Sequence, residues 1–315
     1  MHDRLTIEAY AKVNLTLEVY GRRADGFHEL RSLVLPIALG DTLEIEPTAD
    51  GTICSDTGYG ERDLVVRAAR TLRAASAPDG ASLGARVHVV KRIPAGGGLG
   101  GGSADAAATL RALNVCWGLG RSVEELAALG ARIGSDVPAL VLAPETGGPV
   151  WMEGRGERVR AAEASQIPPF PFLVLVHPGV ASSTTEVYAR CTPRTTPPAG
   201  AVNDLQAAAC AGHPEIATAL AALVAVGAQR VMMSGSGSVV YGFAPDAASA
   251  QTMAARMRAL GCSAWVTSVR ESAKNGKIRG LGLSSASWEG AAGRQRAARP
   301  APSASPGARQ AMPQS

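Results

Sequence analysis

The chain has 315 residues and a mass of 32.2 kDa, and 31 Lys and Arg residues against 27 Asp and Glu residues give a formal charge of +4 at pH 7. Six basic residues and one acid after residue 275 carry a net +5, which leaves about −1 for the remainder. This distribution argues against a nucleic-acid-binding body. A chain that is 46% hydrophobic is not a disordered protein, and the absence of an apolar leader or of roughly 18 consecutive apolar residues predicts a cytoplasmic protein without a membrane span.

The five cysteines and the C-terminal segment further limit the kinds of protein that this chain can be. The cysteines are odd in number, widely spaced and contain no C-x-x-C pair, which argues against a disulfide framework and a structural zinc site. Residues 276–315 are rich in Ala, Ser, Pro, Gly and Gln and lack apolar runs, so we predict a disordered basic tail. About 275 residues remain, which is enough for two lobes.

The first half of the chain alternates strand and helix signals. Strict alternation of apolar and polar residues over 5–19 predicts a strand, with Lys12 and Asn14 together on its polar face. The capping pair Ser122 and Glu125 begins one helix. Further strands are predicted at 30–37, 41–47 and 86–93, and further helices at 63–75 and 103–114.

The second half follows a polar, turn-rich segment, 151–166, that is predicted to join the two lobes. Helix-start signals stand at Ser183 and at Asn203. Strands are predicted at 172–176, 230–233, 239–243 and 264–269, and longer helices at 215–226 and 247–260. The alternation indicates an α+β lobe of the split β-α-β, ferredoxin-like kind.

A glycine-rich run is the strongest local motif. Six of the seven residues 96–102 are glycine, and the run lies between a predicted strand and a predicted Ala-rich helix. Glycines allow several backbone N–H groups to point at one anion, and the helix adds its positive N-terminal end. The run therefore predicts a phosphate-binding loop. No G-x-x-x-x-G-K-[ST] sequence is present, which excludes a Walker P-loop.

A dinucleotide-binding oxidoreductase is an alternative, because Gly96, Gly98 and Gly101 match the G-x-G-x-x-G motif. That motif also needs an acid about 20 residues later at the end of a second strand. The acids at this distance, Glu124 and Glu125, belong to a helix-start signal.

Asp136 and Lys12 supply groups suited to phosphoryl transfer. Asp136 stands in the turn Gly-Ser-Asp-Val-Pro before an apolar segment. Alone, Asp136 is typical of a helix N-cap and Lys12 of a solvated cation on an edge strand. Beside a phosphate loop, the carboxylate can accept a hydroxyl proton and the ammonium can keep that carboxylate ionised.

These features resemble the GHMP kinases, the superfamily of galactokinase, homoserine kinase, mevalonate kinase and phosphomevalonate kinase. Residues 94–104 are similar to its Pro-x-Gly-x-Gly-Leu-Gly-x-x-Ser motif. Within the superfamily the sequence most resembles the 4-diphosphocytidyl-2-C-methyl-D-erythritol kinases. Six stretches in the family's order carry the resemblance: 11–15, 23–30, 96–102, 134–138, 203–205 and 233–237.

The resemblance implies an α+β, two-lobe fold with the site in the cleft, and lobes at 1–160 and 161–275. Asp136 is the expected base for the 2-hydroxyl, and Lys12 is expected to keep it charged and to steady the γ-phosphoryl group. ATP is the expected cofactor, with Mg²⁺ bridging its β- and γ-phosphates, no metal cage of protein side chains, and Ser103 as a possible contact. The residues expected to bind ATP are Asp63 (in place of the usual Asn), Lys91, Pro94, Ala95, Gly96, Gly97, Gly98, Leu99, Gly100, Gly101, Gly102, Ser103 and Ala104.

The expected substrate is a cytidine diphosphate-linked small molecule, with no nucleic acid or membrane as a partner. Phe27 and His28 stand where the family usually has Tyr-His, so the Phe ring can stack on cytosine but lacks the hydroxyl. Core packing of Phe27 and a surface position for His28 is the alternative. Asn14, Thr184 and Tyr188 are further candidate substrate contacts. Another kinase of the superfamily, acting on homoserine, mevalonate or a sugar, is the first rival function.

Overall fold

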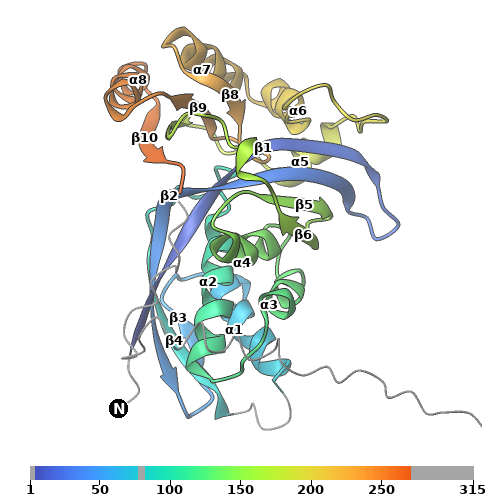
Figure 1. Ribbon diagram of the computed structural model, residues 1–315, viewed down its shortest axis with the longest axis vertical. Coiled ribbons are helices and arrows are strands. Elements are labelled where there is room, and N and C mark those ends of the chain that lie inside the picture. Colours follow the sequence, from blue (N-terminus) through green and yellow to red (C-terminus); the bar gives the residue numbers. More distant parts are fainter. Residues whose placement is uncertain (1–3, 77–81, 271–315) are drawn as a thin grey trace, which may run out of the picture. The chain divides into compact units, whose positions relative to one another are not determined.

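The computed structural model describes residues 4–76 and 82–270, so the predicted tail lies outside the described residues. A six-stranded sheet occupies the first half of the chain (Figure 1). Its order is β3 (Ile53–Ser55), β4 (Gly84–Val90), β2 (His28–Thr48), β5 (Val150–Gly154) and β6 (Arg158–Ala161), and β1 (Leu5–Arg22) pairs with β2. Only β3 and β4 pair in parallel.

Strand β2 is one continuous strand of 21 residues, where the sequence predicted two. Its residues 42–48 pair with β4 and its residues 30–34 pair with β5, while β1 follows it along the other edge. Gly40 stands opposite Tyr10, and the β1–β2 register shifts between Tyr10 and Lys12. A bulge bends a strand without ending it, so the two predicted strands are one strand with an irregular pairing near Gly40.

The predicted solvent-facing side of β1 is wrong at its centre. Lys12 is 2% exposed and Asn14 is fully buried. The register shifts of β1 interrupt strict alternation there, and a second sheet covers this stretch, where the Tyr241 hydroxyl donates a hydrogen bond of 2.8 Å to the Asn14 carbonyl. Burial by a distant segment is a tertiary effect that a period-2 pattern cannot reveal.

The predicted joining segment 151–166 is likewise corrected. Most of it forms the β5–β6 hairpin at the edge of the first sheet, with Trp151 paired to Arg160, followed by a single 3-10 turn, Ala164–Gln166. Charged residues on a solvent-facing edge strand gave this hairpin its loop-like composition.

Four helices cover one face of the first sheet: α1 (Leu64–Ala74), α2 (Gly101–Cys116), α3 (Val123–Gly130) and α4 (Val137–Thr146). Helix α2 packs on β1 and β2 and is buried on nearly all sides, which explains its small alanine side chains. The predicted capping box of Ser122 and Glu125 is present at the start of α3.

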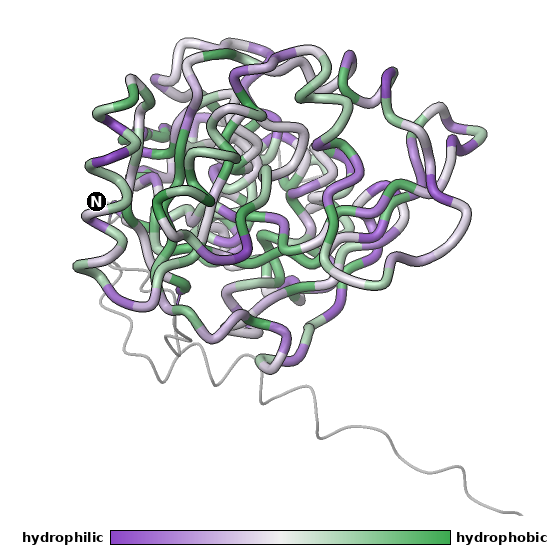
Figure 2. The backbone as a smooth tube through the Cα atoms, turned by 90° about the horizontal axis from the view of Figure 1, so that it is seen from above, coloured by the Kyte–Doolittle hydropathy of each residue, from purple (hydrophilic) through white to green (hydrophobic). Residues whose placement is uncertain are grey.

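The second half forms a four-stranded antiparallel sheet in the order β10 (Ser263–Ser268), β7 (Phe172–His177), β9 (Val240–Ala244) and β8 (Gln229–Met233). Helices α5 (Thr184–Arg190), α6 (Leu205–Gly212) and α7 (Pro214–Ala225) lie between β7 and β8, and α8 (Ala247–Ala259) lies between β9 and β10. This is the predicted split β-α-β arrangement. Hydrophobic and hydrophilic stretches alternate repeatedly along the backbone, as amphipathic packing requires (Figure 2).

Within residues 4–76 and 82–270, no single helix is long and apolar enough to cross a membrane. Helices α6 and α7 meet the length and composition criteria only as a pair, bent by 116°. Both helices contribute buried residues to the core of the second half, among them Leu205, Ile216 and Leu223.

Candidate active site

The glycine-rich loop and the start of α2 line an open cavity of about 400 Å³. Strand β4 ends at Val90, the backbone turns through positive φ at Gly98 and Gly100, and α2 begins at Gly101. These conformations are unfavourable for residues with a Cβ. The cavity is lined by every residue of 94–103, together with Thr57, Tyr59, Arg62, Asp63, Leu64, Lys91, Ile93 and Asp105. The structure thus brings together all but one of the residues expected to bind ATP.

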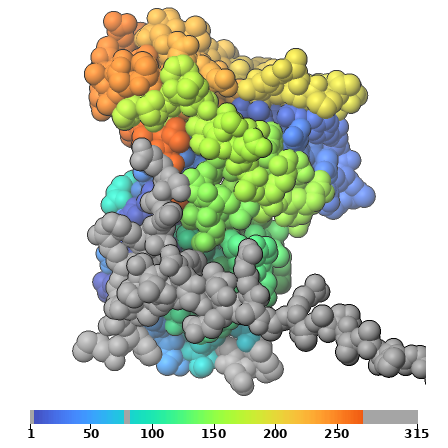
Figure 3. All heavy atoms as spheres, in the orientation of Figure 1, coloured from blue at the N-terminus to red at the C-terminus, as the bar shows by residue number. Residues whose placement is uncertain are grey.

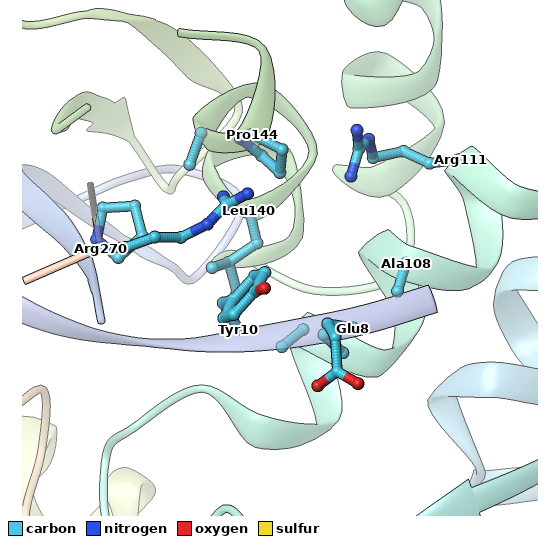
Figure 4. A pocket seen from close by; sticks show the side chains of 11 residues that line it. Glu8, Tyr10, Ala108, Arg111, Leu140, Pro144 and Arg270 are labelled. Atoms are coloured by element: carbon cyan, nitrogen blue, oxygen red, sulfur yellow. The ribbon is translucent and has the colours of Figure 1, made fainter. Parts of the chain in front are cut away.

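Ala104 is the exception. It lies in the first turn of α2 and faces a second, much smaller cavity of about 20 Å³, next to Ala108 and Arg111 (Figure 4). This space is large enough for about one water molecule. Ala104 therefore packs inside the fold, and its part in a phosphate site is limited to its place in the helix.

Lys12 and Asp136 meet beside the phosphate loop. The Lys12 Nζ lies 3.3 Å from the Asp136 Oδ2 and donates a hydrogen bond of 2.7 Å to the Asn14 Oδ1. The Asn14 amide in turn donates to the Ser32 hydroxyl at 2.8 Å. A Cβ at Gly100 would lie 3.1 Å from the Lys12 Cε and 3.6 Å from the Asp136 Oδ2, so the loop backbone contacts both. Lys12 and Asp136 are 124 positions apart in the sequence, and they form the predicted ion pair.

Asp136 occupies the N-cap position of α4, but its side chain makes no capping hydrogen bond. An Asp at this position commonly accepts a hydrogen bond from the helix backbone. Here the carboxylate instead points at Lys12 and keeps 27% of its side chain exposed. It combines a cationic partner with access for a substrate hydroxyl, as a general base requires.

An aromatic pair lies close to Asp136. The rings of His28 and Tyr188 stack with centroids 5.0 Å apart and planes at 28°. Burial, with a further contribution from the Asp136 charge, raises the pKa of Tyr188, so its hydroxyl stays protonated. Phe27 is 48% exposed, and the Arg155 guanidinium carbon lies 5.0 Å from its ring centroid. The alternative, with Phe27 in the core and His28 free at the surface, is therefore excluded, because Phe27 is exposed and His28 stacks on Tyr188.

Thr184, another predicted substrate contact, begins α5 and shares a hydrogen bond of 2.8 Å with the Ser236 hydroxyl. It thereby touches the 234–238 loop between β8 and β9. That loop also contacts the phosphate loop, because the Ser234 hydroxyl donates to the Gly98 carbonyl at 2.9 Å.

Asp63 caps α1 at the edge of the large cavity. Its Oδ1 accepts a hydrogen bond of 2.9 Å from the Val65 N–H, and its Oδ2 accepts hydrogen bonds from the hydroxyls of Ser55 and Thr57. The carboxylate is 4% exposed and both of its oxygens are engaged within the protein. Its observed contacts are those of a helix cap and a support for the 55–57 turn.

Lys91 projects into the same cavity between two buried carboxylates. Its Nζ lies 2.5 Å from Asp41 and 2.6 Å from the Asp105 Oδ2. Burial raises the pKa of Asp105 to about 7, and the neighbouring Lys91 only partly offsets this. For Lys91, burial lowers the pKa, but the hydrogen bonds to Asp105 and Asp41 outweigh it and leave the pKa raised.

Asp41 and Asp105 were not among the predicted site residues. Asp105 closes the glycine-rich motif and stands one turn into α2, which is the signal that could have found it. Asp41, 50 positions before Lys91, carries no local signal. The described residues contain no cluster of three or more His, Cys, Asp or Glu side chains suited to holding a metal ion.

The topology does not match a dinucleotide-binding βαβ unit. There, the strand before the glycine loop and the strand after the helix pair in parallel. Here β4 pairs in parallel only with β3, which precedes it, and antiparallel with β2. Although the loop matches the G-x-G-x-x-G motif, it does not belong to the fold of a dinucleotide-binding oxidoreductase.

Comparison with known proteins agrees with this geometry. The model of the GHMP kinases N-terminal domain matches residues 63–143, and that of the GHMP kinases C-terminal domain matches residues 199–261. The 4-diphosphocytidyl-2-C-methyl-D-erythritol kinase of Symbiobacterium thermophilum is 40% identical over 294 residues, 83% of this chain and 98% of that protein. The enzyme of the same name from Moorella thermoacetica is 38% identical over 81% of this chain and 95% of that protein.

Solved structures show the same fold. A crystal structure of 4-(cytidine 5'-diphospho)-2C-methyl-D-erythritol kinase superposes with a TM-score of 0.71 at 34% identity, covering 84% of this chain and 98% of that one. Homoserine kinase from Cytophaga hutchinsonii shares the fold, with a TM-score of 0.62 at 18% identity, covering 89% of this chain and 98% of that one. The fold is therefore the predicted α+β GHMP kinase fold, and the chain belongs to the 4-diphosphocytidyl-2-C-methyl-D-erythritol kinase family of the GHMP kinases.

Proposed function

We propose that the chain transfers the γ-phosphoryl group of ATP to the 2-hydroxyl of 4-diphosphocytidyl-2-C-methyl-D-erythritol, a step of non-mevalonate isoprenoid precursor synthesis. The observation that carries the proposal is the Lys12–Asp136 pair, 3.3 Å apart, between a phosphate loop and an aromatic pair. The names of relatives that are about 40% identical over most of the chain supply the substrate.

Asp136 is the proposed general base. Its Oδ takes the proton of the 2-hydroxyl while the hydroxyl oxygen forms a bond to the γ-phosphorus and the bond to the β-phosphate oxygen breaks, releasing ADP. Lys12 lies against the Asp136 carboxylate and stabilises the charge on the transferring group. Because Lys12 is buried and held by Asn14, it is already oriented before substrate arrives, which favours the transition state.

The cavity of about 400 Å³ is the proposed ATP site. The backbone of residues 96–102 and the N-terminus of α2 would hold the phosphates. Lys91 lines the same cavity, and Asp63 would act by shaping its wall because both carboxylate oxygens are engaged. Pro94, Ala95, Leu99 and Ser103 complete the lining.

Mg²⁺ is the proposed companion of ATP. The residues present fit such an ion, because one that enters on phosphate oxygens needs few protein ligands. Ser103 is the candidate, since its hydroxyl lies in the first turn of α2, 3.8 Å from the place a Cβ on Gly134 would take, and so faces the Asp136 turn. When bound, the ion would neutralise charge on the phosphates.

The substrate would lie across Asp136 from the nucleotide. His28 and Tyr188, with the exposed ring of Phe27, offer the aromatic surfaces for a cytosine, and Tyr188 supplies the hydroxyl that Phe27 lacks. Asn14 and Thr184 are the proposed polar contacts. We place the lobe boundary at residues 160 and 161, at the end of β6, which is the last strand of the first sheet. We place the reaction in the cytoplasm, where ATP is available, with the small molecule as its partner.

A kinase assay tests the proposal. Purified protein with ATP, Mg²⁺ and the cytidine-linked alcohol should release ADP, and homoserine or mevalonate in its place should not. Asp136→Asn should lower kcat by about 100- to 10,000-fold with little change in KM, since a general base acts in the transition state.

Asp246→Asn is the matched control. Asp246 caps α8 by accepting a hydrogen bond of 2.7 Å from the Ser249 N–H, and Asn caps a helix equally well, so kcat should hold. Normal turnover by Asp136→Asn would remove Asp136 as the base, and turnover of homoserine or mevalonate alone would indicate a sister kinase.

A further inference from the structure

Asn203 is a buried amide whose side chain joins three backbone groups. It is 9% exposed. Its Nδ2 donates to the carbonyls of Met233 and Gly235, at 2.8 Å each, and its Oδ1 accepts from the Leu205 N–H at 3.0 Å. Both donors of the amide are therefore used, one on the last residue of β8 and one on the 234–238 loop. Aspartate could not replace Asn203, because an ionised aspartate has no hydrogen-bond donor.

The loop that Asn203 holds lies directly against the catalytic lysine. A Cβ on Gly235 would lie 3.4 Å from the Lys12 Nζ and 3.2 Å from the Gly98 carbonyl oxygen. The Ser234 hydroxyl donates to that same carbonyl, and the Val239 N–H donates to the Gly97 carbonyl at 3.2 Å. The 234–238 loop thus contacts Lys12 and the phosphate loop together.

Asn203 is itself fixed to the strand that carries Lys12. The Leu17 N–H donates to the Val202 carbonyl at 2.7 Å, the Asp204 N–H donates to the Leu17 carbonyl at 2.9 Å, and Leu17 and Asn203 form a parallel bridge. In Figure 3 the yellow part of the chain, around residue 200, adjoins the blue part near the N-terminus. Strand β1 therefore contacts this region twice: Leu17 pairs with Asn203, and Lys12 lies against Gly235, which Asn203 holds.

We propose that Asn203 is a positioning residue for phosphoryl transfer: it holds the 234–238 loop in the place that fixes the Lys12 ammonium and the Gly98 turn relative to Asp136. This inference rests on the proposed function, since it assigns Lys12 a role in the chemical step. A side chain far along the sequence thereby aligns the catalytic pair without touching substrate. Misplacement of reacting groups by about 1 Å can cost on the order of 100-fold in rate.

Asn203→Ala tests the proposal. We expect kcat per folded molecule to fall about 10- to 100-fold, with KM for the cytidine-linked alcohol changed by less than about threefold, because alignment acts on the chemical step. Backbone hydrogen exchange should quicken at Lys12, whose N–H donates to the Leu99 carbonyl at 3.0 Å, and at Val239.

Asp204→Asn is the matched control. Asp204 ties the same segment to β1 through the Val19 N–H and Arg194, but its side chain makes no contact with the 234–238 loop in the described hydrogen bonds and ion pairs. It should lower the melting temperature while leaving kcat within about threefold. Ser234→Ala, which removes one hydrogen bond to Gly98, should give a smaller kcat loss with the same unchanged KM, and it serves if Asn203→Ala does not fold.

The outcomes separate the inference from the function. Wild-type protein without turnover of the alcohol would refute the proposed function, and the inference would then be decided by the exchange measurement. Exchange at Lys12 and Val239 that is the same in Asn203→Ala as in Asp204→Asn would overturn the inference. Full kcat in Asn203→Ala and Ser234→Ala beside an active wild type would overturn it as well.

Discussion

Replacing Gly98 with alanine tests the contact between the phosphate loop and the 234–238 loop. Gly98 has φ +75°, where a Cβ costs about 1–2 kcal/mol. A Cβ there would also lie 2.0 Å from the Ser234 carbonyl oxygen, whereas such carbon–oxygen contacts are ordinarily about 3.3 Å or longer. The two loops must therefore separate by roughly 1.3 Å, given this contact limit.

This separation would displace the 234–238 loop, which lies against the Lys12 ammonium. We expect Gly98→Ala to lose about 100-fold in kcat, as displacements of about 1 Å in a catalytic site do, and to unfold at a lower temperature. Coupled ADP release measures kcat, and circular dichroism measures the melting temperature.

Gly96→Ala separates strain from contact. Gly96 has φ +69°, so alanine meets a similar backbone cost, but nothing lies within 4 Å of its Cβ position. We expect a similar strain-related loss of stability and at least about tenfold more activity than Gly98→Ala retains. Equal kcat in the two variants would refute the reasoning, because the Ser234 contact would then carry no weight.

Three further results are expected from side chains and segments outside the catalytic pair. Burial raises the pKa of Asp105 to about 7, so between about pH 4 and 7 the folded protein keeps a proton that the unfolded chain has released. The stability of the protein should therefore fall as the pH rises through this range. Asp105→Asn should make the melting temperature less dependent on pH there, and an unchanged dependence would contradict the raised pKa. Burial raises the pKa of Cys116 to about 11 while Cys54 is exposed, so peptide mass spectrometry should find iodoacetamide on Cys54 well before Cys116, and the reverse order would contradict the burial. Deleting residues 276–315 should lower the pI and leave kcat intact, and a large loss of turnover would give that segment a part in the reaction.

The phosphate loop, α2 and the Asp136 turn could be predicted because their signals are local. Glycines before an alanine-rich helix specify the loop, and an Asp-Val-Pro turn specifies the start of α4, whatever the rest of the chain does. The pairing of Lys12 with Asp136 was predicted from the resemblance to the GHMP kinases, because no local sequence pattern links the two residues.

The burial of Lys12 and the partners of Lys91 could not be predicted in this way. Tyr241 covers the Lys12 and Asn14 region from 227 positions beyond Asn14, and Asp41 reaches Lys91 from 50 positions away. A single sequence carries no periodicity that joins such distant residues. Asp63 shows the same limit in the other direction, because the resemblance to the family implied a contact with ATP, whereas its oxygens cap α1 and support the 55–57 turn.

The charges around the large cavity lead to a last prediction about how nucleotide is held. Four ionisable side chains line it, Arg62 and Lys91 against Asp63 and Asp105, and their charges balance once the pH is above the pKa of Asp105, about 7. Such a lining offers little net attraction to a polyanion, so affinity must come from backbone N–H groups and the end of α2, which act at short range and are screened little by salt. The KM for ATP should therefore change by less than about threefold between about 50 and 300 mM KCl. A steep rise in KM with salt would show instead that free cations hold the phosphates, and neutralising Arg62 with Arg62→Gln would then abolish that slope.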